Sequence, residues 1–170
     1  MKRYLFNNSS TFIFIFVIFL YFSLLIGFYY NENSTGGALI DYYGHKKISI
    51  SFANDFLNTF LNFDETSTRH SPILIILLSF FEKFHVNDIV IRLINLHICL
   101  ALPIIFYKCL KIKFNNTDEK YLILLSSLVF LSPTFRSLAI WPDSRIWGLL
   151  FFSFSFYYFL IYKKNRDFGY

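Results

Sequence analysis

The run from Thr11 to Tyr30 most constrains how this chain can fold, because it contains no charged residue. A helix of about 20 residues, at about 1.5 Å per residue, crosses a hydrocarbon core roughly 30 Å thick. A cleaved signal peptide is the competing interpretation, but its apolar core spans only about 7–15 residues. This run is longer and ends in the aromatic residues Phe28–Tyr30, which are typical of a membrane interface. The sequence therefore predicts a retained transmembrane helix at 11–30, with Lys2 and Arg3 on the cytoplasmic side.

The rest of the chain has the composition of a membrane protein: it is 55% hydrophobic and 16% charged, with 24 Phe and 12 Tyr among 170 residues. A soluble domain of this size exposes too much surface to hide so many aromatic side chains. Apolar runs at 89–110, 121–140 and 145–162 predict three further crossings. We therefore expect an all-α integral membrane fold, with about four transmembrane helices in a single membrane domain over 1–170. The basic residues are not separated from the hydrophobic segments, so we expect a lipid bilayer and no nucleic acid as partner.

A long polar segment at 31–88 separates the first crossing from the others and is predicted to lie outside. Apolar residues at Phe52, Phe56 and Phe60 follow a helical period, which predicts an amphipathic interfacial helix near 48–63. The apolar stretch at 72–84 is too short for a hydrocarbon core of roughly 30 Å. It either crosses the membrane or lies at the interface as a juxtamembrane helix.

Lysine and arginine placement favours the interfacial position for 72–84, since cytoplasmic segments carry an excess of these residues. If 72–84 stays outside, nine of the 16 basic residues are cytoplasmic: Lys2, Arg3, Lys108, Lys111, Lys113, Lys120, Lys163, Lys164 and Arg166. If it crosses, six are cytoplasmic: Lys2, Arg3, Lys83, Arg92, Arg136 and Arg145. We therefore predict four crossings with both termini inside.

Candidate functional side chains gather in three places on the predicted outer face: Asp41 with His45, Arg69 with His70, and Arg136 with Asp143. A carboxylate at a membrane surface can act as a general base on an acceptor hydroxyl. Arginines can hold a phosphate bidentately and stabilise the charge that develops as it leaves. These groups suit the transfer of a sugar from a lipid phosphate. The alternative interpretation is that they are solvated loop residues.

Arg92 and Asn95 lie three residues apart, on one face of the helix predicted at 89–110. Arg92 either extends along the helix to the membrane interface or faces a polar cavity inside the bundle.

The order of several motifs resembles the N-terminal part of membrane glycosyltransferases of the GT-C superfamily, which includes protein O-mannosyltransferases and the lipid A aminoarabinose transferase. The motifs are Asp41-Tyr42-Tyr43, Arg69-His70-Ser71-Pro72-Ile73, Arg92-Leu93-Ile94-Asn95, Ser132-Pro133, Arg136 and Asp143-Ser144. The resemblance implies an outer acid after the first helix, then a short juxtamembrane helix, in agreement with the charge distribution. Such enzymes have about twice as many helices or more, so it also implies that this chain is an N-terminal portion.

The resemblance further implies inverting transfer from a polyprenyl-phosphate-sugar donor, with Asp41 as the base. The phosphate would depart against Arg136, Arg69 or Arg92, and His70 and Asp143 complete the predicted substrate-binding set. Because the acid of the family is often a pair, Asp64-Glu65 is the competing candidate for the base.

Some members of the superfamily use a divalent metal, for which Asp41 and Asp143 would be ligand candidates. Two acids are too few to define a metal site. The residue bias suggests an AT-rich genome, and we expect a multi-pass protein of a bacterial inner membrane. The alternative function is a non-enzymatic multi-pass protein that binds lipid or assembles with partner membrane proteins.

Overall fold

The computed structural model describes residues 2–34, 36–66, 68 and 70–167, and all regular elements within them are helical. The α-helices are α1 (Lys2–Tyr29), α2 (Ala38–Asn54), α3 (Phe56–Leu61), α4 (Pro72–Lys83), α5 (Asp88–Cys99), α6 (Ala101–Lys113), α7 (Glu119–Ser127), α8 (Pro133–Ile140) and α9 (Ser144–Asp167). Two short 3-10 helices are η1 (Phe63–Thr66) and η2 (Leu128–Leu131). The all-α prediction is confirmed for the described residues.

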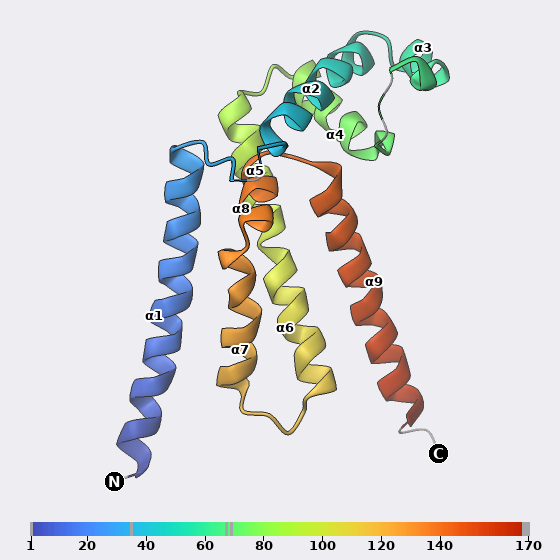
Figure 1. Ribbon diagram of the computed structural model, residues 1–170. Helices are drawn as coiled ribbons and strands as arrows, with labels where there is room; N and C mark the ends of the chain where they lie inside the picture. Colours follow the sequence, from blue (N-terminus) through green and yellow to red (C-terminus); the bar gives the residue numbers. More distant parts are fainter. Residues whose placement is uncertain (1, 35, 67, 69, 168–170) are drawn as a thin grey trace.

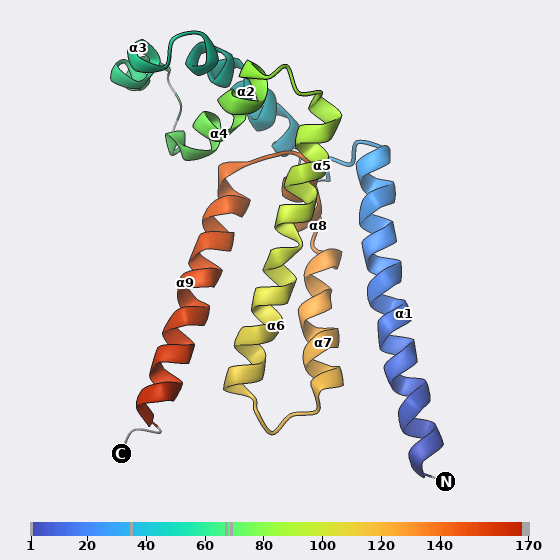
Figure 2. The same ribbon diagram turned by 180° about the vertical axis from the view of Figure 1, so that it is seen from behind.

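The helices form a bundle with a layer across one end (Figure 1). Helices α1, α5 with α6, α7 and α9 extend along the bundle, and α2, α3 and α4 lie over one end. Helix α1 begins and helix α9 ends at the opposite end, where the turn between α6 and α7 also lies; the view from behind shows the same arrangement (Figure 2). The short apolar helix α4 therefore packs with α2 in the layer rather than running along the bundle.

Among the described residues, three helical segments are long and apolar enough to cross a membrane: Thr11–Tyr29, Asp88–Lys113 and Ser144–Arg166. A fourth crossing is present if Glu119–Leu131 and Pro133–Ile140, which are bent by 68°, count as one span. Most residues of the first and last spans are not buried within the protein, and their outward side chains are largely apolar. Such a surface is suited to lipid, where helices satisfy their backbone groups internally.

Prolines explain both breaks in the long helical segments. Pro133 has no backbone N–H, so it starts α8 rather than continuing the preceding helix, and Ser132 caps the new helix by accepting from the Phe135 N–H. Pro103 lies four residues after Cys99, the last residue of α5, and its ring is incompatible with a continuous hydrogen bond to that carbonyl. The break before Pro133 bends the chain by 68°, whereas α5 and α6 still form one continuous span, Asp88–Lys113.

The layer over the end of the bundle differs from the predicted single helix near 48–63. Helix α2 runs without interruption through Gly44 and ends at Asn54, and Asp55 then caps α3 by accepting from the Asn58 N–H at 3.1 Å. One face of α2 is buried, at Tyr42, His45, Ser49 and Phe52, at the three- and four-residue spacing of a helix. The apolar period in the sequence thus belongs to two helices divided at Asp55, because the Asp side chain stabilises a new start there.

A buried asparagine fixes the crossing point of α5, α8 and α9. The Asn95 amide donates to the backbone carbonyls of Leu138 and Ala139, at 3.2 and 2.7 Å, and its oxygen accepts from the Trp147 indole at 2.8 Å. The last carbonyls of a helix have no partner within it, so Asn95 satisfies those at the end of α8. This contact sets the position of the turn that follows α8, where the candidate site lies.

Candidate functional site

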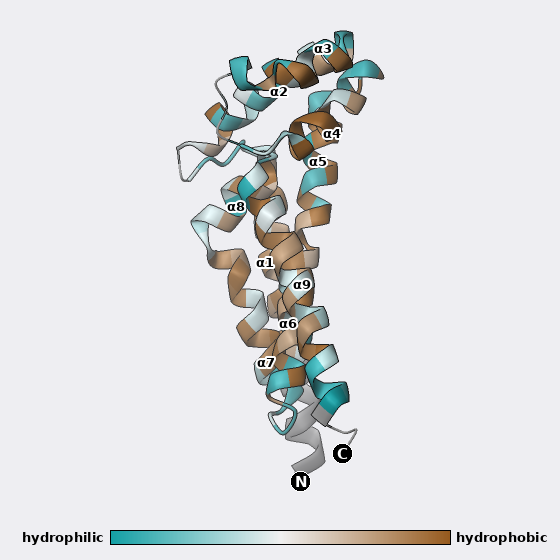
Figure 3. Cartoon of the chain, turned by 90° about the vertical axis from the view of Figure 1, so that its right-hand side faces the viewer, coloured by the Kyte–Doolittle hydropathy of each residue, from teal (hydrophilic) through white to brown (hydrophobic). Residues whose placement is uncertain are grey.

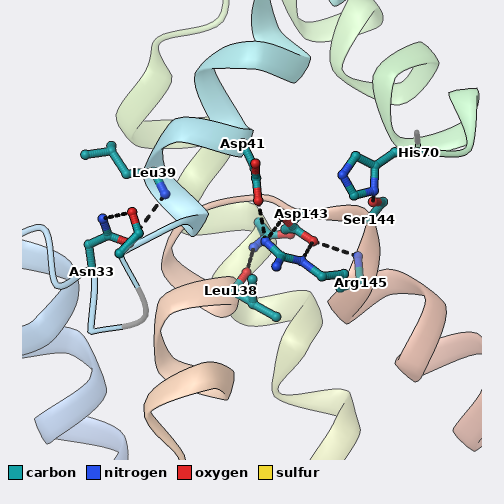
Figure 4. A network of polar contacts seen from close by, with 10 residues as sticks. Asn33, Leu39, Asp41, His70, Leu138, Asp143, Ser144 and Arg145 are labelled. Atoms are coloured by element: carbon teal, nitrogen blue, oxygen red, sulfur yellow. Dashed lines mark hydrogen bonds and ion pairs between the residues drawn. The ribbon is translucent and has the colours of Figure 1, made fainter. Parts of the chain in front are cut away.

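Arg145 joins the two predicted site acids, Asp41 and Asp143, into what we call the Arg145 cluster. Its Nη2 lies 2.5 Å from Asp41 Oδ2 and 2.8 Å from Asp143 Oδ2, and its Nε lies 2.9 Å from Asp143 Oδ1. Asp41 comes from the first turn of α2, and Arg145 from the first turn of α9 (Figure 4). The guanidinium thus holds Asp143 bidentately and Asp41 through one nitrogen.

The two acids of the cluster have different surroundings. The Asp143 side chain is fully buried, whereas those of Asp41 and Arg145 are 36% and 52% exposed. Asp143 also caps α9 by accepting from the Arg145 backbone N–H at 2.7 Å. Burial raises the pKa of Asp143, but the bonds from Arg145 outweigh it and bring the pKa below its usual range. Asp143 is therefore a fixed anion that orients Arg145, and Asp41 is the accessible acid.

A pair of histidines lies beside the cluster. Ser144 Oγ and His70 Nδ1 are 2.7 Å apart, and the rings of His70 and His45 meet edge to face with centroids 4.9 Å apart. His45 is buried and its Nδ1 has no hydrogen-bond partner among the described residues. Burial and the nearby His70 lower the pKa of His45 despite the acids Asp143 and Asp41, so His45 is neutral at pH 7.

Arg136, which we grouped with Asp143 from the sequence, lies in a different network. It donates to both carboxylate oxygens of Glu32, with its Nη2 2.5 Å from Oε2 and its Nε 2.8 Å from Oε1, and to the Ser23 hydroxyl and carbonyl. The hydrogen bond from Arg136 lowers the pKa of Glu32. Gly27 makes room for this pair, because a Cβ there would lie 2.2 Å from Glu32 Oε2. Arg136 therefore connects α8 to the end of α1.

Arg92 is buried, so neither interpretation offered by the sequence describes it. Its guanidinium carbon lies 3.6 Å from the centroid of the Trp141 ring and 5.0 Å from that of Phe28, and its Nε donates to the Ile140 carbonyl at 3.3 Å. The Trp141 indole in turn donates to the Glu32 carbonyl at 3.0 Å. The Arg92 guanidinium thus packs against the face of the Trp141 ring. This contact and the hydrogen bond to Ile140 connect α5 to the end of α8.

Helix α2, which bears Asp41, is held in place by Asp88. The Tyr42 hydroxyl and Lys46 Nζ both donate to Asp88 Oδ1, at 2.5 and 2.8 Å. The cap of α5 is the preceding residue, Asn87, whose side chain accepts from the Ile89 N–H at 2.9 Å. Asp88 instead binds α2 to α5.

The remaining predicted residues lie apart from the cluster or outside the described residues. Arg69 lies outside the described residues. Asp64 and Glu65 are exposed in η1, and no contact in the described part of the chain joins them to the Arg145 cluster. Sequence reasoning missed Arg145 and Glu32. The available signal for Arg145 was its position two residues after a helix-capping acid, where it can reach back to that acid.

The cluster does not fit a divalent cation. Both acids direct oxygens at the guanidinium, and within the described residues no group of three or more His, Cys, Asp or Glu could hold a metal ion. We therefore derive no step through a metal.

Comparison of the chain with protein-family models, curated proteins and solved structures finds no match. A proposal for the function therefore rests on the arrangement of these side chains and on the order of the motifs in the sequence.

Proposed function

We propose that the chain spans a bacterial inner membrane four times, with both ends inside and the layer α2–α4 on the outer face. Three spans and one bent pair support this number, and the layer lies at the end away from the α6–α7 turn. That turn is flanked by Lys111, Lys113 and Lys120, as expected of a cytoplasmic turn. The Arg145 cluster then faces the outer side of the membrane.

Cysteine labelling tests this placement. The two native cysteines, Cys99 and Cys109, are buried, so they can be replaced by Ala or Ser to give an unreactive background. A cysteine at the exposed position Lys47, in α2, should react with an impermeant maleimide added to whole cells. A cysteine at Asn116, in the α6–α7 turn, should react only after the membrane is opened. Labelling of residue 116 in intact cells would contradict the four-crossing topology.

The activity that we propose for this site is transfer of a sugar from a polyprenyl-phosphate donor to an acceptor hydroxyl. The observation that carries it is the pair Asp41 and Arg145: an accessible carboxylate 2.5 Å from an accessible guanidinium at the proposed outer face. A base for the acceptor and a cation for the leaving phosphate are the two groups that such a transfer needs. The motif order shared with the GT-C superfamily supports the same reaction.

In this mechanism Arg145 turns from Asp41 toward the donor phosphate while its Nε stays bonded to Asp143. Asp41, then free, accepts the proton of the acceptor hydroxyl. The acceptor oxygen forms a bond to the anomeric carbon through an oxocarbenium-like state, as in other inverting glycosyl transfers. The bond from that carbon to the phosphate oxygen breaks, its electron pair stays on the polyprenyl phosphate, and Arg145 stabilises the charge.

The experiment compares Asp41→Asn with wild-type protein in native membranes supplied with radiolabelled polyprenyl-phosphate sugars. The amide keeps the size and polarity of the side chain but cannot take the acceptor proton, so transfer should fall about 10²- to 10⁴-fold. Asp64→Asn and Glu65→Gln are the matched controls, because they remove the competing acids. Normal transfer by Asp41→Asn with loss in either control would assign the base to the pair Asp64-Glu65. Loss in none of the three would favour the lipid-binding or assembly function.

A further inference from the structure

An apolar groove lies along the contact between α6 and α9, in the half of the bundle away from the Arg145 cluster. It has a volume of about 500 Å³, within the usual range of small-molecule sites of about 300–1,000 Å³. Its apolar walls include Phe106, Leu110, Leu149, Phe152, Phe156 and Leu160. Coloured by hydropathy, the bundle is brown along its length and teal where α6 and α9 approach their ends (Figure 3).

Two lysines line the polar end of this groove: Lys113, the last residue of α6, and Lys163, near the end of α9. In the proposed topology this end lies at the cytoplasmic surface, where lysines attract anionic lipids. An apolar trough that ends in two cations matches the shape and charge of one molecule: an acyl chain with an anionic headgroup. We propose that the α6–α9 groove binds an anionic phospholipid of the cytoplasmic leaflet.

The charge at its mouth distinguishes this groove from a second apolar hollow of the bundle. The groove between α1, α6 and α7 is lined by hydroxyl groups and apolar side chains, such as Tyr21, Ser126 and Phe130, and by no charged residue. A phosphate headgroup has no cation to bind there. The lipid site is also separate from the donor site, because the donor phosphate binds Arg145 at the opposite end. It therefore rests on the proposed membrane placement but not on sugar transfer.

Native mass spectrometry of the purified full chain in a neutral detergent tests the proposal directly. Phosphatidylglycerol and phosphatidylcholine with identical acyl chains are the two probes. The wild-type protein should bind phosphatidylglycerol preferentially, and Lys113→Gln/Lys163→Gln should lose roughly 30-fold in affinity, at about fivefold for each cation near an anionic lipid. Lys164→Gln/Arg166→Gln removes the same number of charges from the same end of the bundle but outside the groove, and should keep the preference.

A second variant tests the apolar part. Ser153 lines the groove, so Ser153→Trp should fill it and weaken phosphatidylglycerol binding while both lysines remain. Glycerol phosphate, which lacks acyl chains, should not compete. Three results would each overturn the proposal. The wild type could bind the two lipids equally, the two double variants could lose affinity equally, or glycerol phosphate could displace the lipid. The proposal would also be overturned if the wild-type protein formed a dimer, showed no preference between the two lipids, and became monomeric on Ser153→Trp. A second copy of the chain would then occupy the groove.

Discussion

Neutralising Glu32 should measurably destabilise the fold, because Glu32 and Arg136 join α1 to α8. Three hydrogen bonds connect the guanidinium to the carboxylate, and the side chains of Glu32 and Arg136 are only 22% and 14% exposed. Breaking a fully buried pair costs about 3–5 kcal/mol, and an exposed pair contributes about 0–1 kcal/mol. Arg136 would retain its two bonds to Ser23, so we expect Glu32→Gln to cost about 2 kcal/mol, as for hydrogen bonds to a charged group.

The assay is unfolding in mixed micelles titrated with sodium dodecyl sulfate and followed by circular dichroism. Glu32→Gln, Arg136→Gln and the double variant form a cycle that isolates the interaction between the two residues. The pH dependence supplies a further check, since the folded pKa of Glu32 lies below its ordinary value of 4.5. A lowered pKa contributes stability in full above the unfolded value, and this contribution is lost as the pH falls through the folded value. A change under 0.5 kcal/mol in Glu32→Gln, with additive single variants, would refute the reasoning.

Glycine substitutions give a matched pair for the same interaction. Alanine at Gly148, in α9, would meet nothing within 4 Å and should stabilise the helix by about 0.5–1 kcal/mol. Alanine at Gly27 gains the same propensity, but its Cβ would displace Glu32 Oε2 and Arg136 Nη2. The net result should be a loss of about 1 kcal/mol, as the propensity offsets part of the weakened pair. Equal effects of the two alanines in the same titration would show that the pair does not constrain Gly27.

Three further outcomes follow from the contacts around the site. Tyr42→Phe should lower the free energy of unfolding by about 1.5–3 kcal/mol in the same titration, because it removes a hydrogen bond to the charged Asp88. Asn95→Leu should cost more than Tyr42→Phe, because it leaves two carbonyls at the end of α8 and the Trp147 indole unpaired, and Trp147 fluorescence should shift. Because burial and His70 lower the pKa of His45, stability should decline as the pH falls below about 6.5 toward the folded pKa, and His45→Asn should remove that part of the decline.

The helices could largely be predicted from the sequence because their signals are local. The uncharged run at 11–30, the short apolar stretch at 72–84 and the interruption at Ser132-Pro133 correspond to α1, α4 and the break before α8. The break at Asp55 was also a local signal, since Asp followed by an apolar helical run is typical of a cap. The apolar residues on both sides of Asp55 follow one continuous helical period, so the sequence was interpreted as a single helix.

The pairing of charges could not be predicted, because it depends on which residues meet across the bundle. Arg136 was matched with Asp143 through proximity in sequence, but the end of α1 brings Glu32 to it from 104 residues away. Asp143 is bound instead by Arg145, and the same guanidinium reaches Asp41 because Tyr42 anchors α2 on Asp88. Two arginines on the same face of the protein thus have different roles, which only their partners distinguish.

The most direct test of the proposed chemistry is the transfer assay on Arg145→Gln and Arg136→Gln, with activity expressed per folded molecule. Loss of the Arg145 cation should reduce transfer per folded molecule about 10²- to 10³-fold, as for other donors that stabilise developing charge. Arg136→Gln should unfold more easily but transfer sugar normally once folded, since Arg136 binds Glu32 and Ser23. Normal transfer by Arg145→Gln together with loss in folded Arg136→Gln would contradict the assignment of the phosphate to the Arg145 cluster.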